Sequence, residues 1–203
     1  ITLEGIGALD IGSLDVGSTS AGTITLSANA AIDDAASADT TADLTAGTVD
    51  IDAAGGIGAS DHLDVDAGTV TADNSTAAAV DINSLLTSGT VTVNSLTTDS
   101  STIGFAQSGG AALDIAGGVA SGTGSTDGGD VTITSSAGLT VNAAIDTTTG
   151  SGGTLTMDGV TVNTSPVLGA GNIDLSGGAA DTSVGGDIST GGDFTVTADD
   201  DII

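Results

Sequence analysis

The sequence predicts an all-β fold, a parallel β-helix (β-solenoid) of nine to ten coils with about 21 residues per coil. A short glycine-led phrase recurs along the whole chain, and apolar and polar residues alternate with a period of two within it. No stretch sustains the i, i+3, i+4, i+7 spacing of an amphipathic helix, which 33 glycines would also interrupt. We therefore interpret residues 1–203 as a single β-solenoid repeat segment, part of a longer chain or a fibre subunit.

The recurring phrase is a glycine, one or two residues, and then an apolar-polar-apolar triplet. It starts at Gly22, Gly47, Gly68, Gly89, Gly110, Gly129, Gly153, Gly171 and Gly192. Its first apolar residues are Ile24, Val49, Val70, Val91, Leu113, Val131, Leu155, Ile173 and Phe194, which are spaced by about 21 residues on average. Because equivalent residues of successive coils lie above one another, we expect these side chains to stack inside the solenoid.

Further apolar pairs with the same alternation lie between the copies. They are Leu63 and Val65, Val80 and Ile82, Ile103 and Phe105, Leu139 and Val141, and Val160 and Val162. Each repeat therefore holds two or three short strands joined by Gly, Asn, Asp and Ser turns. Stacking at about 4.8 Å per coil predicts a rod on the order of 45 Å long. The only proline, Pro166, falls between two expected strands, where its missing N–H costs little.

Two other classes of structure compete with the solenoid. An acidic chain with two aromatic residues is often disordered, but Leu, Ile, Val and Phe supply 47 of 203 residues, above the level typical of disorder. An antiparallel sandwich or barrel would also alternate, but such folds rarely repeat one phrase at one spacing. The regular spacing favours the solenoid.

The charge excludes several classes of partner. The chain has no Lys or Arg, 27 acidic residues and a formal net charge of -27. Without cations to meet phosphates, nucleic acid is not an expected partner, and binding to anionic membrane is disfavoured. The sequence contains no run of 18 or more apolar residues, so it does not predict membrane insertion. The absence of cysteine excludes disulfides and thiolate chemistry and is compatible with an extracellular location.

The outward positions of the repeated strand are mainly Thr, interrupted by Asp. Thr suits an exposed strand, which explains this pattern without a ligand. A flat Thr-x-Thr array also resembles ice-binding solenoids, and complete pairs occur at Thr23/Thr25, Thr69/Thr71, Thr90/Thr92 and Thr154/Thr156. Aspartates such as Asp50 and Asp114 interrupt that array, and Asp seldom follows Asp at one ladder position, which dilutes like-charge repulsion.

Three groups of aspartates are candidates for cation binding: Asp33–Asp34, Asp64–Asp66 and Asp199–Asp201. None has the spacing of an EF-hand, and the glycine-rich Ca²⁺-binding nonapeptide is missing. We therefore predict no metal site, no cofactor and no cofactor-binding residues, and at most loose binding of divalent cations such as Ca²⁺ at these patches.

The sequence predicts no catalytic residues. His62 is the only histidine, and a lone exposed histidine is usually an ordinary surface residue. Enzymes that act on polysaccharide on a β-helix usually hold the sugar with Lys, Arg or aromatic residues, and this chain has no Lys, Arg, Tyr or Trp. Paired carboxylates alone could hydrolyse a glycoside, but no particular pair stands out among 27 acids.

The phrases AGNIDLSGG (170–178), GGDISTGGDFTVTADDDI (185–202) and GTVTVNSL (89–96) resemble the repeat region of filamentous-haemagglutinin-type exoproteins. The resemblance covers essentially the whole chain and lies in its composition and period. It implies a long right-handed β-helix that projects from a bacterial surface and is exported by a partner outer-membrane protein.

These observations together predict a structural, extracellular or cell-surface protein: a β-solenoid stalk or a component of a self-assembling fibre or sheath. Its expected partners are further coils, either of the same chain or of other copies docked end to end. The alternative is an adhesin module that binds glycan or another cell surface, and such a module should carry an irregular insertion or an aromatic cluster on one coil. The only longer intervals between copies, 24–49 and 131–155, are short insertions rich in Asp, Thr and Gly, which favours the structural role. An ice-binding solenoid and a polysaccharide-acting enzyme are the less favoured alternatives.

Overall fold

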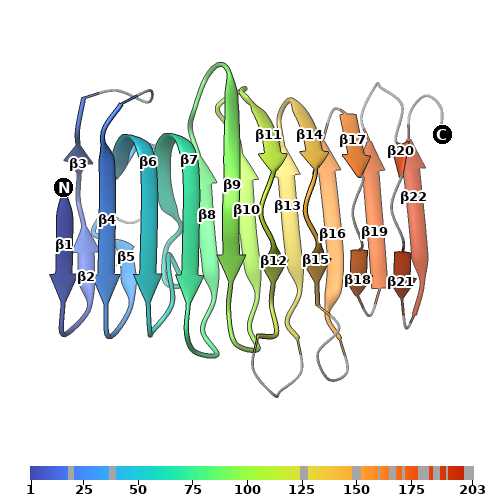
Figure 1. Cartoon of the computed structure of the whole chain (residues 1–203), viewed down its shortest axis with the longest axis horizontal. Helices are drawn as coiled ribbons and strands as arrows, with labels where there is room; N and C mark the ends of the chain where they lie inside the picture. The colour runs from blue at the N-terminus through green and yellow to red at the C-terminus, as the bar shows by residue number, and fades with distance from the viewer. Residues whose placement is uncertain are drawn as a thin grey trace.

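The computed structural model is an all-β solenoid whose coils follow one another from the N-terminal to the C-terminal end (Figure 1). It describes residues 1–17, 21–36, 40–123, 128–147, 152–159, 161–164, 168–170, 172–177, 183–184, 188–190 and 192–198. Pro166 and Asp199–Asp201 lie outside these residues. The described part of the chain contains no helix with the length and apolarity needed to span a membrane.

The strands are short, with few longer than eight residues. They are β1 (Thr2–Gly5), β2 (Leu9–Ile11), β3 (Leu14–Asp15), β4 (Thr23–Ala28), β5 (Ile32–Asp34), β6 (Leu44–Ala53), β7 (Leu63–Asn74), β8 (Val80–Ser84), β9 (Thr90–Thr97), β10 (Ile103–Gln107), β11 (Ala112–Ile115), β12 (Val119–Ala120), β13 (Val131–Ser135), β14 (Gly138–Val141), β15 (Ile145–Asp146), β16 (Thr154–Gly159), β17 (Thr161–Thr164), β18 (Leu168–Ala170), β19 (Asn172–Gly177), β20 (Ser183–Val184), β21 (Ile188–Thr190) and β22 (Phe194–Ala198).

Every pairing between these strands is parallel, and each strand pairs with its equivalent in the next coil. We follow two columns of paired strands, named column A and column B. Column A runs through β1, β4, the C-terminal halves of β6, β7 and β9, and then β12, β15, β18 and β21. Column B runs through β2, β5, Ile57, β8, β10, β13, β16, β19 and β22. The described solenoid has about 7 turns of about 23 residues each. These turns are fewer and slightly longer than the nine to ten coils of about 21 residues that the sequence predicted.

The nine copies of the repeated phrase do not form one ladder, which corrects the stacking expected from the sequence. Ile24, Val49 and Val70 do stack in column A. An irregularity after Val70 then pairs that residue with Val93 instead of Val91. Val91 pairs with Leu113, which pairs with Leu139 and not with Val131.

The last four copies lie in column B. Val131 pairs there with Ile103, and the ladder continues through Leu155, Ile173 and Phe194. The physical reason is that an apolar-polar-apolar triplet after a turn fits any strand whose inner face is buried. The phrase therefore marks a strand of the solenoid without specifying its column.

The interior is filled by aliphatic side chains that stack from coil to coil. Ile24, Leu26, Val49 and Ile51 are all fully buried, as are most of their equivalents along both columns. The pairs predicted between the copies also point inward wherever their side chains are described, from Leu63 and Val65 to Leu139 and Val141. β-Branched and γ-branched side chains suit this stacking because they pack against identical neighbours one strand away. Each added coil therefore extends the same core.

Two corners of the coil carry buried polar side chains that the sequence analysis did not identify. One set is Asn74, Thr98, Ser121 and Thr147, each at most 2% exposed. They directly follow the paired residues of column A in successive coils. The other set is Ser84, Gln107 and Ser135, which pair with one another in column B.

These side chains, except Ser84 with its buried hydroxyl that has no hydrogen-bond partner among the described residues, satisfy backbone groups where the chain turns. The Asn74 amide nitrogen donates to the carbonyl oxygens of Thr76 and Ala78, at 2.7 Å each, and its oxygen accepts from the Gly56 N–H at 3.1 Å. Thr147 and Ser121 likewise donate to the carbonyl oxygens of Gly153 and Gly129. A tight corner leaves backbone groups without strand partners, so these side chains replace the missing hydrogen bonds.

The two phenylalanines provide a matched test of the stacked core. Phe105 is 1% exposed and pairs in column B with Ile82 and Ile133, whereas Phe194 is 44% exposed. We expect Phe105→Ala to lower the free energy of unfolding by about 3–5 kcal/mol, because it leaves a cavity between two coils. Phe194→Ala should cost much less. Urea unfolding followed by far-UV circular dichroism measures both, and equal losses would contradict the stacked core.

The buried polar corner that contains Asn74 is also tested by urea unfolding. Asn74→Ala leaves the Gly56 N–H unpaired inside the corner and should cost about 1–3 kcal/mol of unfolding free energy. Asn142 is the matched control because its side-chain amide also donates a hydrogen bond, to the Asp114 carboxylate at 2.8 Å, but on an exposed surface. Asn142→Ala should change the stability by less than about 0.5 kcal/mol. A similar effect of both substitutions would show that burial of the corner is unimportant.

Candidate functional site

Two inserted segments interrupt the regular coils on one side of the solenoid. Residues 12–13 join β2 to β3 in the first coil, whereas residues 35–43 join β5 to β6 in the second. In the third coil, residues 58–62 lie between Ile57 of column B and β7. We name the first segment, of which residues 35–36 and 40–43 are described, insert 1, and residues 58–62 insert 2. These are irregular insertions of the kind that the sequence analysis associated with an adhesin.

Insert 2 begins with a glycine that its geometry requires. Gly58 has a φ of 61°, in the left-handed region, and a Cβ at this position would clash with the carbonyl oxygen of Asp81. The Gly58 N–H continues the column by donating to the Ile32 carbonyl oxygen at 2.8 Å. The backbone thus leaves column B directly after Ile57 and lies beside it again at the start of β7, where Leu63 pairs with Ile82 of β8.

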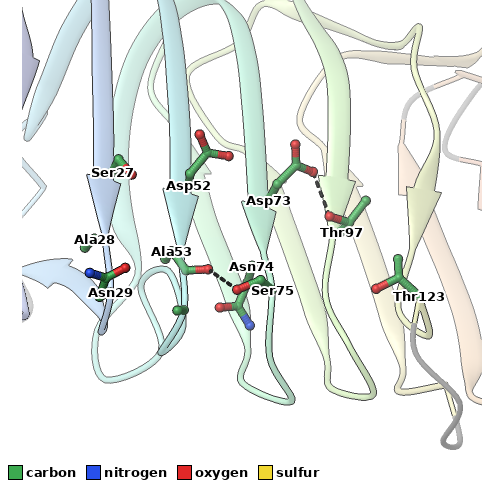
Figure 2. Close-up of a pocket in the computed structure, with 11 residues that line it drawn as sticks. Ser27, Ala28, Asn29, Asp52, Ala53, Asp73, Asn74, Ser75, Thr97 and Thr123 are labelled. Atoms are coloured by element: carbon green, nitrogen blue, oxygen red, sulfur yellow. Dashed lines mark hydrogen bonds between the residues drawn. The ribbon is translucent and has the colours of Figure 1, made fainter. Parts of the chain in front are cut away.

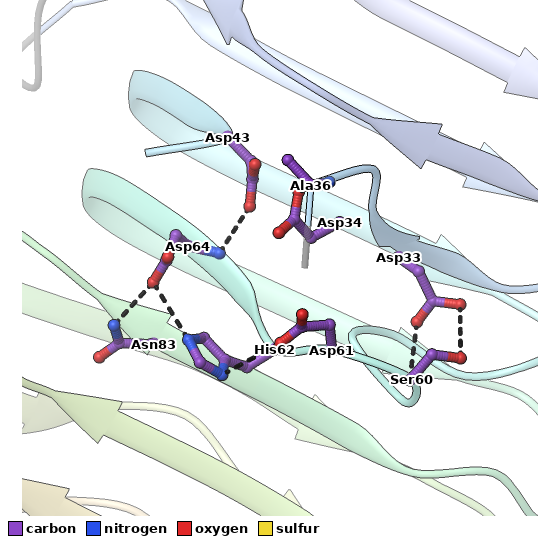
Figure 3. A network of polar contacts seen from close by, with 9 residues as sticks. All are labelled: Asp33, Asp34, Ala36, Asp43, Ser60, Asp61, His62, Asp64 and Asn83. Atoms are coloured by element: carbon purple, nitrogen blue, oxygen red, sulfur yellow. Dashed lines mark hydrogen bonds and ion pairs between the residues drawn. The ribbon is translucent and has the colours of Figure 1, made fainter. Parts of the chain in front are cut away.

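The two inserts meet in a group of polar side chains that we name the acidic cluster: Asp33, Asp34, Asp43, Ser60, Asp61, His62, Asp64 and Asn83 (Figure 3). At its centre, Asp43 and Asp64 are only 2% and 3% exposed. The Asp64 N–H donates to Oδ2 of Asp43 at 2.8 Å, and the Asp43 N–H donates to the Asp64 carbonyl oxygen at 2.8 Å. The two residues are therefore held together in both directions.

The central carboxyl, that of Asp43, has a strongly altered acidity. Burial raises the pKa of Asp43 to about 7, and the Asp64 N–H opposes this rise by stabilising the charged form. A side-chain hydrogen bond with Asp34 and the negative charges of Asp34 and Asp64 raise the pKa further. Asp43 therefore keeps its proton to a much higher pH than an ordinary aspartate does.

His62 lies at the edge of the acidic cluster and is the only basic side chain in the sequence. Its Nε2 is 3.6 Å from Oδ1 of Asp64, and its Nδ1 is 3.7 Å from Oδ1 of Asp61. The side chain is 39% exposed. The sequence predicts an ordinary surface histidine; in the structure, His62 is partly exposed and lies between two carboxylates.

Insert 2 is also joined to β5 of the preceding coil. Ser60 donates from its N–H to Oδ1 of Asp33 at 3.1 Å and from its hydroxyl to Oδ2 at 3.4 Å. Asn83 of β8 donates its amide to Oδ1 of Asp64 at 2.6 Å, which ties the cluster to the next coil (Figure 3). The acidic cluster therefore spans three successive coils.

A second candidate is a shallow groove of about 420 Å³ on the outer face of column A (Figure 2). It is lined by Ser27, Ala28, Asn29, Asp52, Ala53, Ala54, Asp73, Asn74, Ser75, Thr97 and Thr123. Asp52 and Asp73 are paired between neighbouring coils and form an exception to the expectation that Asp seldom follows Asp at one ladder position. Partial desolvation raises the pKa of Asp52, and the charges of Asp50 and Asp73 add to the rise.

Hydroxyl groups make this pair of carboxylates tolerable. Oδ1 of Asp73 accepts hydrogen bonds from the hydroxyls of Ser95 and Thr97, at 2.7 Å each. Hydrogen bonds to the ionised form offset part of the repulsion from Asp52. The groove thus offers carboxylates, hydroxyls and amides to a hydrophilic or cationic ligand.

The candidate cation ligands predicted from sequence are only partly brought together. Asp34 and Asp64 join the acidic cluster through Asp43, a residue that the sequence analysis did not select. Oδ1 of Asp66 is buried without a hydrogen-bond partner, and burial raises the pKa of Asp66. Within the described ranges, no group of three or more His, Asp or Glu side chains has an arrangement that could hold a metal ion. Loose Ca²⁺ binding remains a prediction.

The Thr-x-Thr pairs considered for ice binding do not share one face. Thr23/Thr25 and Thr69/Thr71 lie in column A, separated by the coil that carries Asp50, whereas Thr154/Thr156 lie in column B.

The fold defines the class of the chain as a parallel β-solenoid repeat protein. Comparison with protein-family models, with curated proteins and with solved structures gave no match.

The pKa of Asp43 predicts a pH dependence of stability. Asp43 has a pKa near 3.8 when unfolded and about 7 when folded, so the folded chain binds more protons between these values. Its contribution is therefore fully present below about pH 4, is lost as pH rises toward 7, and stays lost above pH 7. Asp43→Asn, which mimics the protonated form, should become more stable than the wild type by about 1–4 kcal/mol across this range.

The measurement is urea unfolding of both chains from pH 4 to 9. Asp10→Asn is the control because Asp10 is exposed on β2 and the substitution removes the same charge. If the Asp10 variant shows the same pH-dependent gain, the effect comes from net charge and not from Asp43.

Proposed function

We propose that this chain is a structural module of a microbial cell surface, a stalk or a component of a self-assembling fibre or sheath. The observation that carries the proposal is the continuity of column B, in which the same inward position is paired in every coil from β2 to β22. A solenoid built in this way gains length with each coil at a nearly constant cross-section. Its sequence resemblance to filamentous-haemagglutinin-type repeats supports the same role.

The first and last coils each have a strand that is paired on one side, which supports a further coil as the proposed partner. In the described structure, β1 pairs with β4 and β22 pairs with β19, each on one side. Because the coils are parallel, the first edge has the polarity needed to continue the last one, whether the added coil belongs to the same chain or to another copy. Head-to-tail docking of this kind is heterologous and produces open filaments.

The composition supports an extracellular or cell-surface location. The chain contains no Lys or Arg, so a trypsin-like protease has no cleavage site, and it contains no cysteine that depends on a redox environment. Its high negative charge keeps separate rods apart laterally. Lateral repulsion together with end-to-end pairing favours long single filaments over sheets of rods.

An adhesin module is the second candidate, and inserts 1 and 2 favour it. They place an irregular polar surface on one side of the second and third coils, which a purely repetitive stalk does not need. Such a surface would recognise a glycan or another cell surface. It could coexist with the structural role, because the inserts leave the pairing of column B intact.

The proposal is tested by negative-stain imaging of the purified 203-residue chain, with and without millimolar Ca²⁺. Eight steps of about 4.8 Å predict a single rod of about 40 Å. Rods far longer than this would show end-to-end docking, and a Ca²⁺ dependence would assign a role to the aspartates. Short single rods in both conditions would contradict self-assembly.

A substitution that removes one backbone N–H, Thr2→Pro, makes the imaging test specific for docking through β1. The Ile1 nitrogen donates to the Thr23 carbonyl and the Ile1 carbonyl accepts from the Thr25 N–H, so the N–H of Thr2 points away from β4. Thr2→Pro removes this outward donor and should prevent docking, whereas Thr2→Ala keeps the donor and should not. Filaments of equal length from both variants would exclude docking through β1.

A further inference from the structure

We propose that copies of this chain dock end to end in one register, in which β2 of one copy continues column B directly after β22 of another. Leu9 of the first copy then covers Phe194 of the second. One residue further along, Asp10 lies beside Thr195. The inference rests on the proposed end-to-end docking and specifies the interface that performs it. The two strands lie at opposite ends of the solenoid (Figure 1).

The first observation is the distribution of incompletely buried apolar side chains. Among the described residues, the exposed large hydrophobic side chains are those of Ile1, Ile6 and Phe194. The side chains that pack against the core but are only partly buried are those of Leu3, Leu9, Leu14, Val16 and Val196. All of these belong to the first coil or to β22 of the last coil. The two ends therefore present apolar surfaces, and contact between them would remove both from water.

The second observation is the direction of the backbone groups of β2. The Leu9 N–H donates to the Ala31 carbonyl oxygen of the second coil at 2.9 Å. Because successive residues of a parallel strand bond to opposite neighbours, the Asp10 N–H points to the free side of β2. Within the solenoid, the equivalent residue of β8, Asp81, donates its N–H to the Ile57 carbonyl oxygen of the preceding coil at 2.8 Å. Asp10 is thus oriented to bond a preceding coil.

The free edge of β22 supplies the matching acceptor. The Asp193 carbonyl oxygen accepts from the Ile173 N–H of β19 at 2.9 Å. By the same alternation, the carbonyl oxygen of the next residue, Phe194, points away from β19. In the proposed register the Asp10 N–H of one copy donates to this Phe194 oxygen of the other, which repeats the hydrogen bond between Asp81 and Ile57.

The third observation is that charge and burial together select this register. A slip of two residues in one direction would place Asp10 beside Asp193, and the chain has no Lys or Arg to neutralise the pair. A slip of two residues in the other direction would leave Phe194 uncovered. A slip of one residue would turn the apolar side chains of β2 outward. In the proposed register Asp10 lies beside Thr195, whose hydroxyl can donate to the carboxylate.

The core of column B already shows how a phenylalanine is accommodated between coils. Phe105 pairs with Ile82 on one side and Ile133 on the other, and it is 1% exposed. Phe194 pairs with β19 on one side only and is 44% exposed. Leu9 supplies the second aliphatic neighbour in the docked pair. Phe194 therefore becomes a buried aromatic anchor of the interface.

Thiol cross-linking tests the register, because the 203-residue chain has no cysteine of its own. In the proposed pairing Gly12 follows β2 and lies beside Thr197, so Gly12→Cys combined with Thr197→Cys places the two residues about 4.8 Å apart. A Cβ at Gly12 meets nothing closer than 4.0 Å, so this position accepts a side chain. The control combines Gly12→Cys with Thr195→Cys, which adds an offset of about 7 Å along the strand.

A short bifunctional thiol reagent should convert the first double variant into a ladder of covalent multimers on denaturing gels. We expect its yield to exceed that of the control by about fivefold or more, because the cross-link depends on the distance between the two residues.

Filament growth tests the anchor. Phe194→Ala should raise the concentration needed for filaments to sediment by about tenfold or more, because truncation removes the aromatic side chain buried at the interface. Thr195→Ala is the matched control from the outer face of β22, and it should change this concentration by less than about threefold. Sedimentation at about 0.15 M salt limits the repulsion between the acidic copies.

The outcomes distinguish the register from the docking itself. Equal cross-linking of the two double variants, or equal effects of Phe194→Ala and Thr195→Ala, would overturn the proposed register. Filaments in negative stain without cross-links between Gly12→Cys and Thr197→Cys would also overturn it, but would leave the proposed fibre intact. Short single rods without cross-links would contradict docking between copies altogether, and would leave further coils of the same chain as the partner of these ends.

Discussion

Parallel pairing in register between successive coils is the constraint on which the rest of this structure depends. It places each residue directly above its equivalent one strand spacing away, so every position must tolerate a neighbour of its own kind. Aliphatic side chains gain from such stacking, and threonine accepts it at the surface. Aspartate does not, and Asp52 above Asp73 is tolerated with the help of hydroxyls from Ser95 and Thr97.

Because the chain has no Lys or Arg, its carboxylates are stabilised by hydrogen-bond donors instead of ion pairs. Backbone N–H groups and short polar side chains supply these donors, as at Asp33 with Ser60 and Asp114 with Asn142. Where such donors are few and water is excluded, a proton takes their place, which is the situation of Asp43. The acidic composition and the acidic cluster thus have one physical origin.

The sequence was sufficient to predict the strands, their inward residues and their parallel stacking, because period-two alternation reports directly on one-sided burial. It was insufficient to assign the columns, since the phrase at Val131 reads like the phrase at Val49 although the two lie on different sides. The corner residues Asn74 and Thr98 look like ordinary turn residues until their burial is known. Within the acidic cluster, Asp34 and Asp64 stood out as members of acidic pairs, but Asp43 did not, because its contact with Asp64 forms only when the third coil folds onto the second.

The direction of the hydrogen bonds in this ladder has a mechanical consequence. Bonds between coils run along the solenoid axis, so a pulling force applied to the two ends loads the outermost coil before the others. The rod would then yield by peeling one coil at a time, each releasing about 23 residues, or roughly 80 Å of extended chain. A rod built in this way dissipates a sudden load over many small steps and does not fail in one.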